Sequence, residues 1–419
     1  MTGSADGSAR PEAWEGHRHG ALFPEPTRAL RRDLSQLFCA VAGLLLGLLT
    51  PLVAAGPQVA AGRVASVLFT LGFGVVSLVS IIYSMLFLVV QFSASTFTPR
   101  LGLFRDEPIV WRAFAFTVGV FVFCITSGLA IGSRESVSAF VPCVAMLLTL
   151  VALGLMRTLQ MKAFDSIQLG HSLTSITARA HRSYDGLYPR AHAPDRAGAA
   201  QSPAAAGASV TVRWTGRPAV LQGIDVPALM DLARVHDSSV AFRVAPGATL
   251  SRGMVIAEVT VGGPAEAALS AVMSTGVERT FDQDPELPFR LLADIALRAL
   301  SAAVNDPATA VEALDRLEDL LTRLADRDLD IGRFHDPDGP LRVSIPVPRW
   351  DQYVRTAVDD VIFAAARSPM ALRRVRDLLR RLVEGIPECR RAVVHDRLRW
   401  VERTGSGEFP LVWTAADDG

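Results

Sequence analysis

Residues 64–99 read VASVLFTLGFGVVSLVSIIYSMLFLVVQFSASTFTP and contain no Asp, Glu, Lys, Arg or His. Three further stretches, residues 35–62, 113–133 and 136–156, also lack these five residue types. Each of the four stretches is long enough to cross a bilayer, which takes about 20 apolar residues. The sequence therefore predicts an α-helical integral membrane protein with four transmembrane helices, at about residues 35–55, 65–92, 113–132 and 137–156.

Arginines in the short flanks of these spans predict the orientation of the protein. Three arginines stand shortly before span one, and one stands between spans one and two. Three stand between spans two and three, and one stands between spans three and four. Cytoplasmic flanks are enriched in Lys and Arg, so we expect both termini in the cytoplasm. Lys162 is the only lysine, which is typical of GC-rich bacterial coding. The expected location is therefore the bacterial inner membrane, with the lipid bilayer as the first partner.

Composition excludes several classes of chemistry. The 419 residues carry a formal net charge of zero, which gives no reason to expect a nucleic-acid partner. A single lysine, just after the fourth span, leaves no candidate for a Walker phosphate site, a Schiff base or a biotinyl or lipoyl arm. The four cysteines form no CxxC pair, so a zinc ribbon is not expected. We expect no cofactor and no metal site.

The rest of the chain shows changes in composition that suggest separate regions. Within the segment that follows the linker, VTVRW (210–214) and AVLQGI (219–224) predict a hairpin, and Asp225 predicts a helix N-cap. The expected regions are a disordered tail at 1–27, the four-helix transmembrane domain at 28–160, a helical extension at 161–190, a low-complexity linker at 191–208, a small α+β unit at 209–263, a mainly helical cytoplasmic domain at 264–403 and a C-terminal tail at 404–419.

Two of the spans carry helix-packing or length signals. Gly43 and Gly47 in span one have a small-xxx-small spacing, which lets two membrane helices approach closely. The second uncharged stretch, as one helix, would extend roughly 54 Å, against a hydrocarbon core of about 30 Å. We therefore expect this helix to tilt or to project beyond the membrane.

The second span also carries polar residues at intervals of seven, a spacing that keeps them on one helical face. These residues, which we call the polar stripe, are Thr70, Ser77, Ser84, Gln91 and Thr98. In a structural interpretation, the hydroxyls bond to their own backbone or pack against a neighbouring helix. In a functional interpretation, copies of the helix from several subunits face a common axis and line a hydrated, passive pathway. A homo-oligomer is expected in the second case.

Two charged blocks lie in the C-terminal half. Residues 278–338 hold fifteen acidic residues and seven arginines, and residues 367–403 hold eleven arginines and five acidic residues. They could be complementary faces of one domain or of two subunits. Alternatively, the arginine-rich helices could bind anionic lipid headgroups, where each basic residue contributes about 1 kcal/mol.

The most distinctive motif of this half is Asn305-Asp306-Pro307. Asp306 is suited to an N-cap and Pro307 to the first helical position, where its missing N–H costs nothing. In the helix before the motif, Arg290, Asp294 and Arg298 recur at intervals of four and form one charged ridge.

The run DIALRALSAAVNDPATA (294–310), with ERTFDQD (278–284) and QFSASTFTPR (91–100), resembles an uncharacterised bacterial family of predicted membrane proteins, DUF2254. The resemblance covers roughly residues 30–400. It implies several membrane spans followed by a cytoplasmic domain, and it brings no established activity. The residues that match its motifs are Pro99, Arg100, Asp294, Arg298, Asn305, Asp306, Pro307 and Thr309.

Three functions follow as hypotheses. The leading one is an oligomeric channel-like or sensor-like protein, with the polar stripe lining a passive pathway and the cytoplasmic domain controlling assembly or gating. The second is a membrane-tethered hydrolase with a site near Asp294 and Asp306, because paired carboxylates with an arginine can perform acid–base or metal chemistry. The three dipeptides His236-Asp237, His335-Asp336 and His395-Asp396 are similar to metal phosphohydrolase pairs, but no further ligand pattern accompanies them. The third is a structural membrane scaffold.

Overall fold

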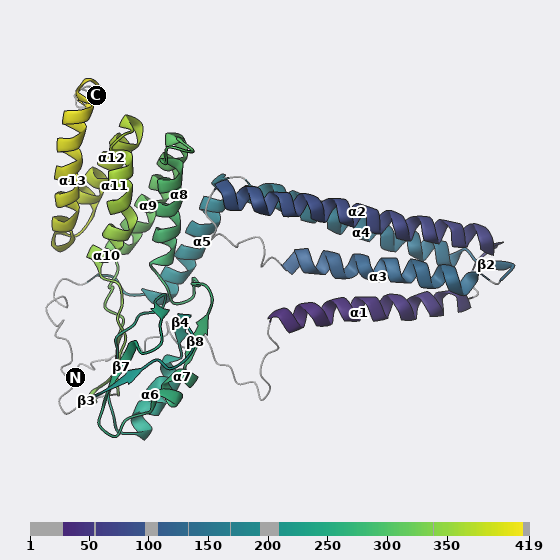
Figure 1. The fold of residues 1–419 in the computed structure, drawn as a ribbon, viewed down its shortest axis with the longest axis horizontal. Coiled ribbons are helices and arrows are strands. Elements are labelled where there is room, and N and C mark those ends of the chain that lie inside the picture. Colours follow the sequence, from purple (N-terminus) through teal and green to yellow (C-terminus); the bar gives the residue numbers. More distant parts are fainter. Residues whose placement is uncertain are drawn as a thin grey trace, which may run out of the picture. The chain divides into compact units, whose positions relative to one another are not determined.

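The computed structural model of the chain describes residues 28–53, 56–96, 108–132, 134–167, 169–192, 209–337 and 339–413 (Figure 1). This part of the chain forms two compact units that meet in sequence between Ser172 and Leu173. We call them the bundle unit and the α/β unit. The predicted N-terminal tail, residues 193–208 of the predicted linker and the last six residues lie outside the described residues.

Four long helices form the bundle unit, namely α1 (Arg28–Leu49), α2 (Ala61–Thr96), α3 (Pro108–Ile131) and α4 (Phe140–Ile167). Each contains a segment apolar and long enough to cross a membrane: Leu34–Leu52, Ala61–Leu88, Ile109–Ile131 and Phe140–Lys162. These segments agree with the four predicted spans. The second is part of one unbroken helix of 36 residues, as the long uncharged stretch predicts.

Glycines bring α1 and α3 into close contact. A Cβ atom at Gly43 would lie 2.2 Å from the carbonyl oxygen of Gly119, and one at Gly119 would lie 2.7 Å from that of Cys39. Ser127 Oγ donates a hydrogen bond of 3.1 Å to the carbonyl oxygen of Gly47, again across the two helices. The small-residue spacing of span one therefore creates the backbone-to-backbone approach that such spacings allow.

A short antiparallel ribbon closes one end of the bundle unit. It pairs β1 (Gln58–Ala60), which precedes α2, with β2 (Ser136–Ser138), which precedes α4. The backbone N–H of Ala61 also donates to the carbonyl oxygen of Glu135 at 3.1 Å. The ribbon thus fixes the first residues of α2 against the connection between α3 and α4, and α1 ends beside it in a 3₁₀ turn, η2 (Thr50–Leu52).

The helix α5 (Leu169–Leu187) begins two residues after α4 ends and occupies most of the predicted helical extension. From Leu173 onward it is part of the α/β unit. Its buried Tyr184 stacks on Phe289 of a later helix, with ring centroids 6.2 Å apart. The hydroxyl groups of the buried Tyr188 and Tyr353 lie 2.6 Å apart, which links α5 to the C-terminal helices.

The α/β unit contains two sheets with one shared hydrophobic core. One is five-stranded, in the order β3-β7-β5-β10-β9, and the other is three-stranded, in the order β6-β4-β8. The strands are β3 (Ser209–Arg213), β4 (Ala219–Ile224), β5 (Val240–Phe242), β6 (Thr249–Leu250), β7 (Val255–Thr260), β8 (Met273–Gly276), β9 (Arg333–His335) and β10 (Leu341–Ser344).

The predicted hairpin of residues 210–224 is wrong, because β3 and β4 belong to different sheets. Between the two strands the chain folds around the side chain of Trp214, which is only 8% exposed. Its indole N–H donates to the carbonyl oxygen of Arg217 at 2.9 Å. The chain therefore leaves the first sheet at Trp214, and β3 pairs with the later strand β7 from Ser209↔Thr260 to Arg213↔Val255.

The boundary predicted at residue 263 also needs correction. β8 joins the three-stranded sheet after that position, and β9 and β10 join the five-stranded sheet about 70 residues later. β10 pairs in parallel with β5 through Val343↔Val240, and Val343 is fully buried. The edge of β5 needs a partner for its backbone groups, and the partner comes from beyond the intervening helices rather than from the local sequence.

Helices complete the α/β unit. They are α6 (Val226–Val235), α7 (Glu266–Ala271), α8 (Leu287–Ala299), α9 (Pro307–Ala325), α10 (Trp350–Val354), a π-helical turn η4 (Arg355–Asp359), α11 (Asp360–Ala365), α12 (Pro369–Gly385), α13 (Glu388–Glu408) and α14 (Pro410–Trp413). Asp225 caps α6, as predicted, by accepting a hydrogen bond of 3.1 Å from the backbone N–H of Ala228.

Residues 404–413 are not the tail that composition suggests. α13 continues to Glu408, and α14 then places Trp413, 5% exposed, against it. A Cβ atom at Gly405 would lie 2.1 Å from the Trp413 ring, so the ring packs where only glycine leaves room. The indole N–H donates to Glu402 Oε2 at 2.7 Å. One buried aromatic residue therefore holds the C-terminal segment in place.

Candidate functional site

The polar stripe lies on the face of α2 that its neighbours leave uncovered. Thr70, Ser77, Ser84 and Gln91 are all exposed in the single chain, whereas Thr98 lies outside the described residues. The opposite face packs against the rest of the bundle and includes Val64, Leu68, Gly72, Val75, Ile82 and Leu86. Hydrophobic residues therefore hold α2 in the bundle, and the stripe faces away from it.

Several of these hydroxyl groups bond to their own helix. Thr70 Oγ1 donates to the carbonyl oxygen of Ser66 at 2.8 Å, and Ser84 Oγ donates to that of Ser80 at 2.9 Å. The same pattern, at 3.0 Å, joins Ser80 to Val76. The bonds match the structural interpretation of the stripe, and they leave the hydroxyl oxygens with free lone pairs.

Apolar side chains alternate with the stripe on the same face of α2. Phe73, Ile81 and Leu88 are 59%, 66% and 65% exposed, which is high for residues of this size. In an α-helix these positions fall within about 40° of Ser77 around the helix axis. The uncovered face of α2 is therefore mixed, with polar rows separated by bulky hydrophobic residues.

The NDP motif forms a helix cap, as its sequence predicts. Asp306 is the N-cap of α9 and Pro307 occupies the first turn. Asp306 Oδ1 accepts from the backbone N–H of Thr309 at 3.2 Å, and Oδ2 accepts from the Thr309 hydroxyl at 2.7 Å. These bonds lower the pKa of Asp306, because they favour its ionised form. Asn305 precedes the cap with φ of +48°, a conformation that asparagine tolerates better than most residues.

The residues proposed for a hydrolase site do not converge. Asp294 forms an ion pair with Arg290 one turn earlier on α8, at 3.0 Å. Asp306 is exposed and fully engaged in the cap. Arg298 Nε is buried without a hydrogen-bond partner. Within the described residues, no group of three or more His, Cys, Asp or Glu side chains is placed to hold a metal ion. Pro99 and Arg100 lie outside those residues.

The segment ERTFDQD has a clear structural role that the sequence did not reveal. Gln283 bonds through both ends of its amide to the backbone of Ile224: Oε1 accepts from the N–H at 2.8 Å and Nε2 donates to the carbonyl at 3.1 Å. Asp284, only 2% exposed, accepts two hydrogen bonds from Arg279. A Cβ atom at Gly247 would lie 2.3 Å from the Asp284 carboxylate. The segment therefore joins the start of α8 to the three-stranded sheet.

The acidic and basic blocks pair within the α/β unit. Arg374 and Arg381 of α12 both bond to Glu318 of α9, and Arg374 also bonds to Asp315 at 2.6 Å. Burial alone would raise the pKa of Glu318, but the hydrogen bonds from Arg381 and Arg374 outweigh it and lower the pKa. The first interpretation of the blocks, complementary faces of one domain, therefore describes this contact.

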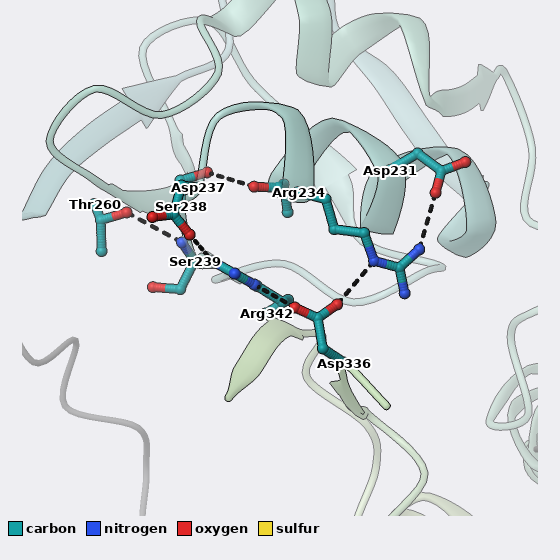
Figure 2. A network of polar contacts seen from close by, with 9 residues as sticks. Asp231, Arg234, Asp237, Ser238, Ser239, Thr260, Asp336 and Arg342 are labelled. Carbon is teal, nitrogen blue, oxygen red and sulfur yellow. Dashed lines mark hydrogen bonds and ion pairs between the residues drawn. The ribbon is translucent and has the colours of Figure 1, made fainter. Parts of the chain in front are cut away.

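The aspartates of the three His-Asp dipeptides of this unit pair with arginines, and that of His395-Asp396 pairs with Arg399. Figure 2 shows Asp336 between Arg234 of α6 and Arg342 of β10, with hydrogen bonds of 2.8 and 2.7 Å. Arg342 also pairs with Asp237 at 2.8 Å. The hydrogen bonds from Arg342 and then Arg234 lower the pKa of Asp336. The network joins α6 to the last two strands of the sheet.

A shallow groove of about 450 Å³ follows β3 in the same unit. Its walls are β3, the end of β7 and the turn from Gly262 to Glu266. None of the residues that the sequence singled out as candidates lines it. The polar stripe is therefore the candidate site whose geometry needs a functional explanation.

Comparison with known proteins identifies relatives but no solved structure. A family model described as "Predicted membrane protein (DUF2254)" matches residues 34–381. The uncharacterized proteins Rv1290c of Mycobacterium tuberculosis and Mb1321c of Mycobacterium bovis are each 26% identical to the chain over 366 residues. Each alignment covers 83% of this chain and 69% of the relative. No solved structure matches the chain.

Proposed function

Because the chain belongs to the DUF2254 family of predicted membrane proteins, we propose that it forms an oligomer whose α2 helices line a passive pathway across the bacterial inner membrane. The observation that carries this proposal is the position of the polar stripe, which is exposed in the single chain along four successive heptad positions. A pathway without a charged residue at membrane depth suits passive permeation better than coupled transport.

The cost of exposing the stripe to lipid favours a protein partner. Thr70, Ser80 and Ser84 satisfy their hydroxyl donors within α2, which lowers that cost. The side-chain amide of Gln91 carries two N–H donors and one acceptor. A single backbone carbonyl nearby can satisfy only part of this group. Water in a pathway, or the same helix of another subunit, can supply partners for such a group. A homo-oligomer with α2 at its centre meets this requirement.

The proposed orientation follows from the arginine flanks, which place the termini and the α/β unit in the cytoplasm. In that position the α/β unit is suited to control assembly or gating. The argument is one of connectivity: α5 continues the chain almost directly from α4, and its residues Leu173, Ile176, Ala180 and Tyr184 are buried in the α/β unit. Movement of that unit would therefore act on the end of a membrane span.

Anionic lipid headgroups are a second proposed partner. The ion pairs with α9 occupy Arg374 and Arg381, so this proposal depends on exposed arginines outside those pairs, such as Arg367 and Arg403. Charged headgroups would attract them at the cytoplasmic surface.

Thiol accessibility tests the pathway directly. In a background with the four native cysteines replaced by alanine, single cysteines are placed at Ser77, Ser84 and Gln91, and the full chain is studied in membranes with a charged, water-soluble thiol reagent. The control is Leu147→Cys on α4, a position 62% exposed that should face lipid. We expect the stripe cysteines to react and the control to stay protected. Equal protection at all four positions would exclude the pathway.

A further inference from the structure

The heptad row of the polar stripe extends one heptad further toward the N-terminus than Thr70. Arg63 precedes Thr70 by seven residues and lies in the first turn of the same unbroken helix α2. Like Thr70, Ser77, Ser84 and Gln91, it is exposed in the single chain. A seven-residue row drifts by only about 20° per heptad on a straight helix, and a left-handed supercoil of several helices removes the drift. Arg63 therefore belongs to the face that the proposed oligomer turns toward its axis.

Arg63 is also the single charged residue of α2, because the segment Ala61–Thr96 contains no other Asp, Glu, Lys or Arg. The Arg63 side chain is exposed at the start of this helix in the single chain. Its positive charge is thus available to an ion that approaches this end of the helix.

The neighbouring charges do not cancel that of Arg63. The connection before α4 lies against the start of α2 through the Ala61–Glu135 backbone hydrogen bond, and it contributes Arg134 and Glu135. Arg134 Nη1 donates to the carbonyl oxygen of Pro51 at 2.6 Å. The three side chains Arg63, Arg134 and Glu135 leave one net positive charge per chain at this end of the bundle unit. The N-terminus of α2, with its partial positive charge, adds to the same sign.

We infer that Arg63 residues of several subunits form a positive ring at one mouth of the α2-lined pathway and make it selective for small anions. This inference rests on the proposed function. Rings of Arg or Lys give anion selectivity in known pores, because fixed charge at a mouth concentrates ions of the opposite sign. The stripe itself offers hydroxyl oxygens and one amide, which discriminate little between hydrated ions. The mouth therefore determines the sign of the permeating ion.

The test measures ion selectivity of the full chain in planar lipid bilayers under a KCl gradient. For the wild type we expect a reversal potential that is shifted from zero toward the equilibrium potential of chloride. Arg63→Cys, in the cysteine-free background, should lower the anion-to-cation permeability ratio by about threefold or more. Treatment of that same folded variant with a cationic methanethiosulfonate should restore the ratio, and an anionic methanethiosulfonate should invert the preference. Arg134→Cys, at the same end but outside α2, should respond much less to either reagent.

The outcomes separate the two proposals. Conduction with a cation preference, or a ratio that ignores the sign of the reagent at position 63, would overturn the anion ring while leaving the pathway intact. Absence of any conductance in the wild type would overturn the pathway and the ring together. A reagent effect as large at position 134 as at position 63 would assign the selectivity to general surface charge, which also overturns the ring.

Discussion

Replacing Asp306 distinguishes a helix cap from a reactive carboxylate in the NDP motif. Asp306→Ala removes both hydrogen bonds to Thr309, and the loss of an N-cap costs about 1 kcal/mol. Asparagine and aspartate are about equally good N-cap residues. The substitution Asp306→Asn should therefore cost only a few tenths of the free energy that Asp306→Ala costs. The Asp306→Ala energy corresponds to a roughly fivefold faster local opening of the first turn of α9.

The effect of pH on this cap has a defined sign. Hydrogen bonds from Thr309 lower the pKa of Asp306 in the folded protein below its ordinary value of 3.8. A lowered folded pKa means that the charge contributes its full stabilisation above the unfolded value and loses it as the pH falls through the folded value. At neutral pH the wild type should therefore keep its small advantage over Asp306→Asn, and it should lose this advantage as the pH falls below about 4.

Amide hydrogen exchange of the full chain in lipid nanodiscs measures this directly. The backbone N–H of Thr309 should exchange about fivefold faster in Asp306→Ala and close to the wild-type rate in Asp306→Asn. Unchanged exchange in Asp306→Ala would refute the cap. Loss of ion flux in Asp306→Asn, which keeps the cap but lacks the charge, would show that the charge itself matters and would contradict the structural role assigned here.

Three further substitutions test other contacts of the fold. Gly43→Val should separate α1 from α3 and cost about 1–3 kcal/mol, seen as a lower thermal midpoint in detergent, whereas Gly154→Val, with no atom within 4 Å of its Cβ position, should have little effect. Gln283→Leu should leave the N–H and C=O of Ile224 without their partners and cost about 2 kcal/mol, and unchanged hydrogen exchange at Ile224 would contradict it. Arg390→Met should remove the hydrogen bonds to the carbonyl oxygens of Leu324, Ala325 and Arg327. The end of α9 should then be destabilised by about 3 kcal/mol. Full retention of urea resistance would show that water replaces those bonds.

Features that depend on neighbouring residues in the sequence were predictable. The four membrane spans follow from uncharged apolar stretches, and the caps at Asp225 and Asp306 follow from an acceptor placed three residues before the N–H it binds. The unbroken length of α2 follows from the absence of a proline or charged residue between Val64 and Thr96. In each case a short segment contains all the information.

Contacts between distant residues were not predictable from one sequence. The parallel pairing of β10 with β5 joins strands of four and three residues that are about 100 positions apart, and no periodicity in either strand specifies the other. The same is true of Gln283 and Ile224, 59 residues apart. The charged blocks predicted that acidic and basic helices could pair, but only the packing of α9 on α12 selects Glu318 for Arg374 and Arg381.

The polar stripe illustrates the limit for the functional site. The heptad spacing of Thr70, Ser77, Ser84 and Gln91 was sufficient to place them on one face of a helix. Whether that face was covered depended on which side of α2 the other helices occupied, and the sequence of α2 does not contain this information. Arg63 stands seven residues before Thr70, and it belongs to the same helical row because α2 begins at Ala61.

The most direct test of the central claim is a structure of the full-length protein at native stoichiometry in a lipid bilayer. We predict an oligomer in which Thr70, Ser77, Ser84 and Gln91 of every subunit face a shared, water-filled axis. A monomer, or an oligomer with those four residues turned toward lipid, would contradict the account.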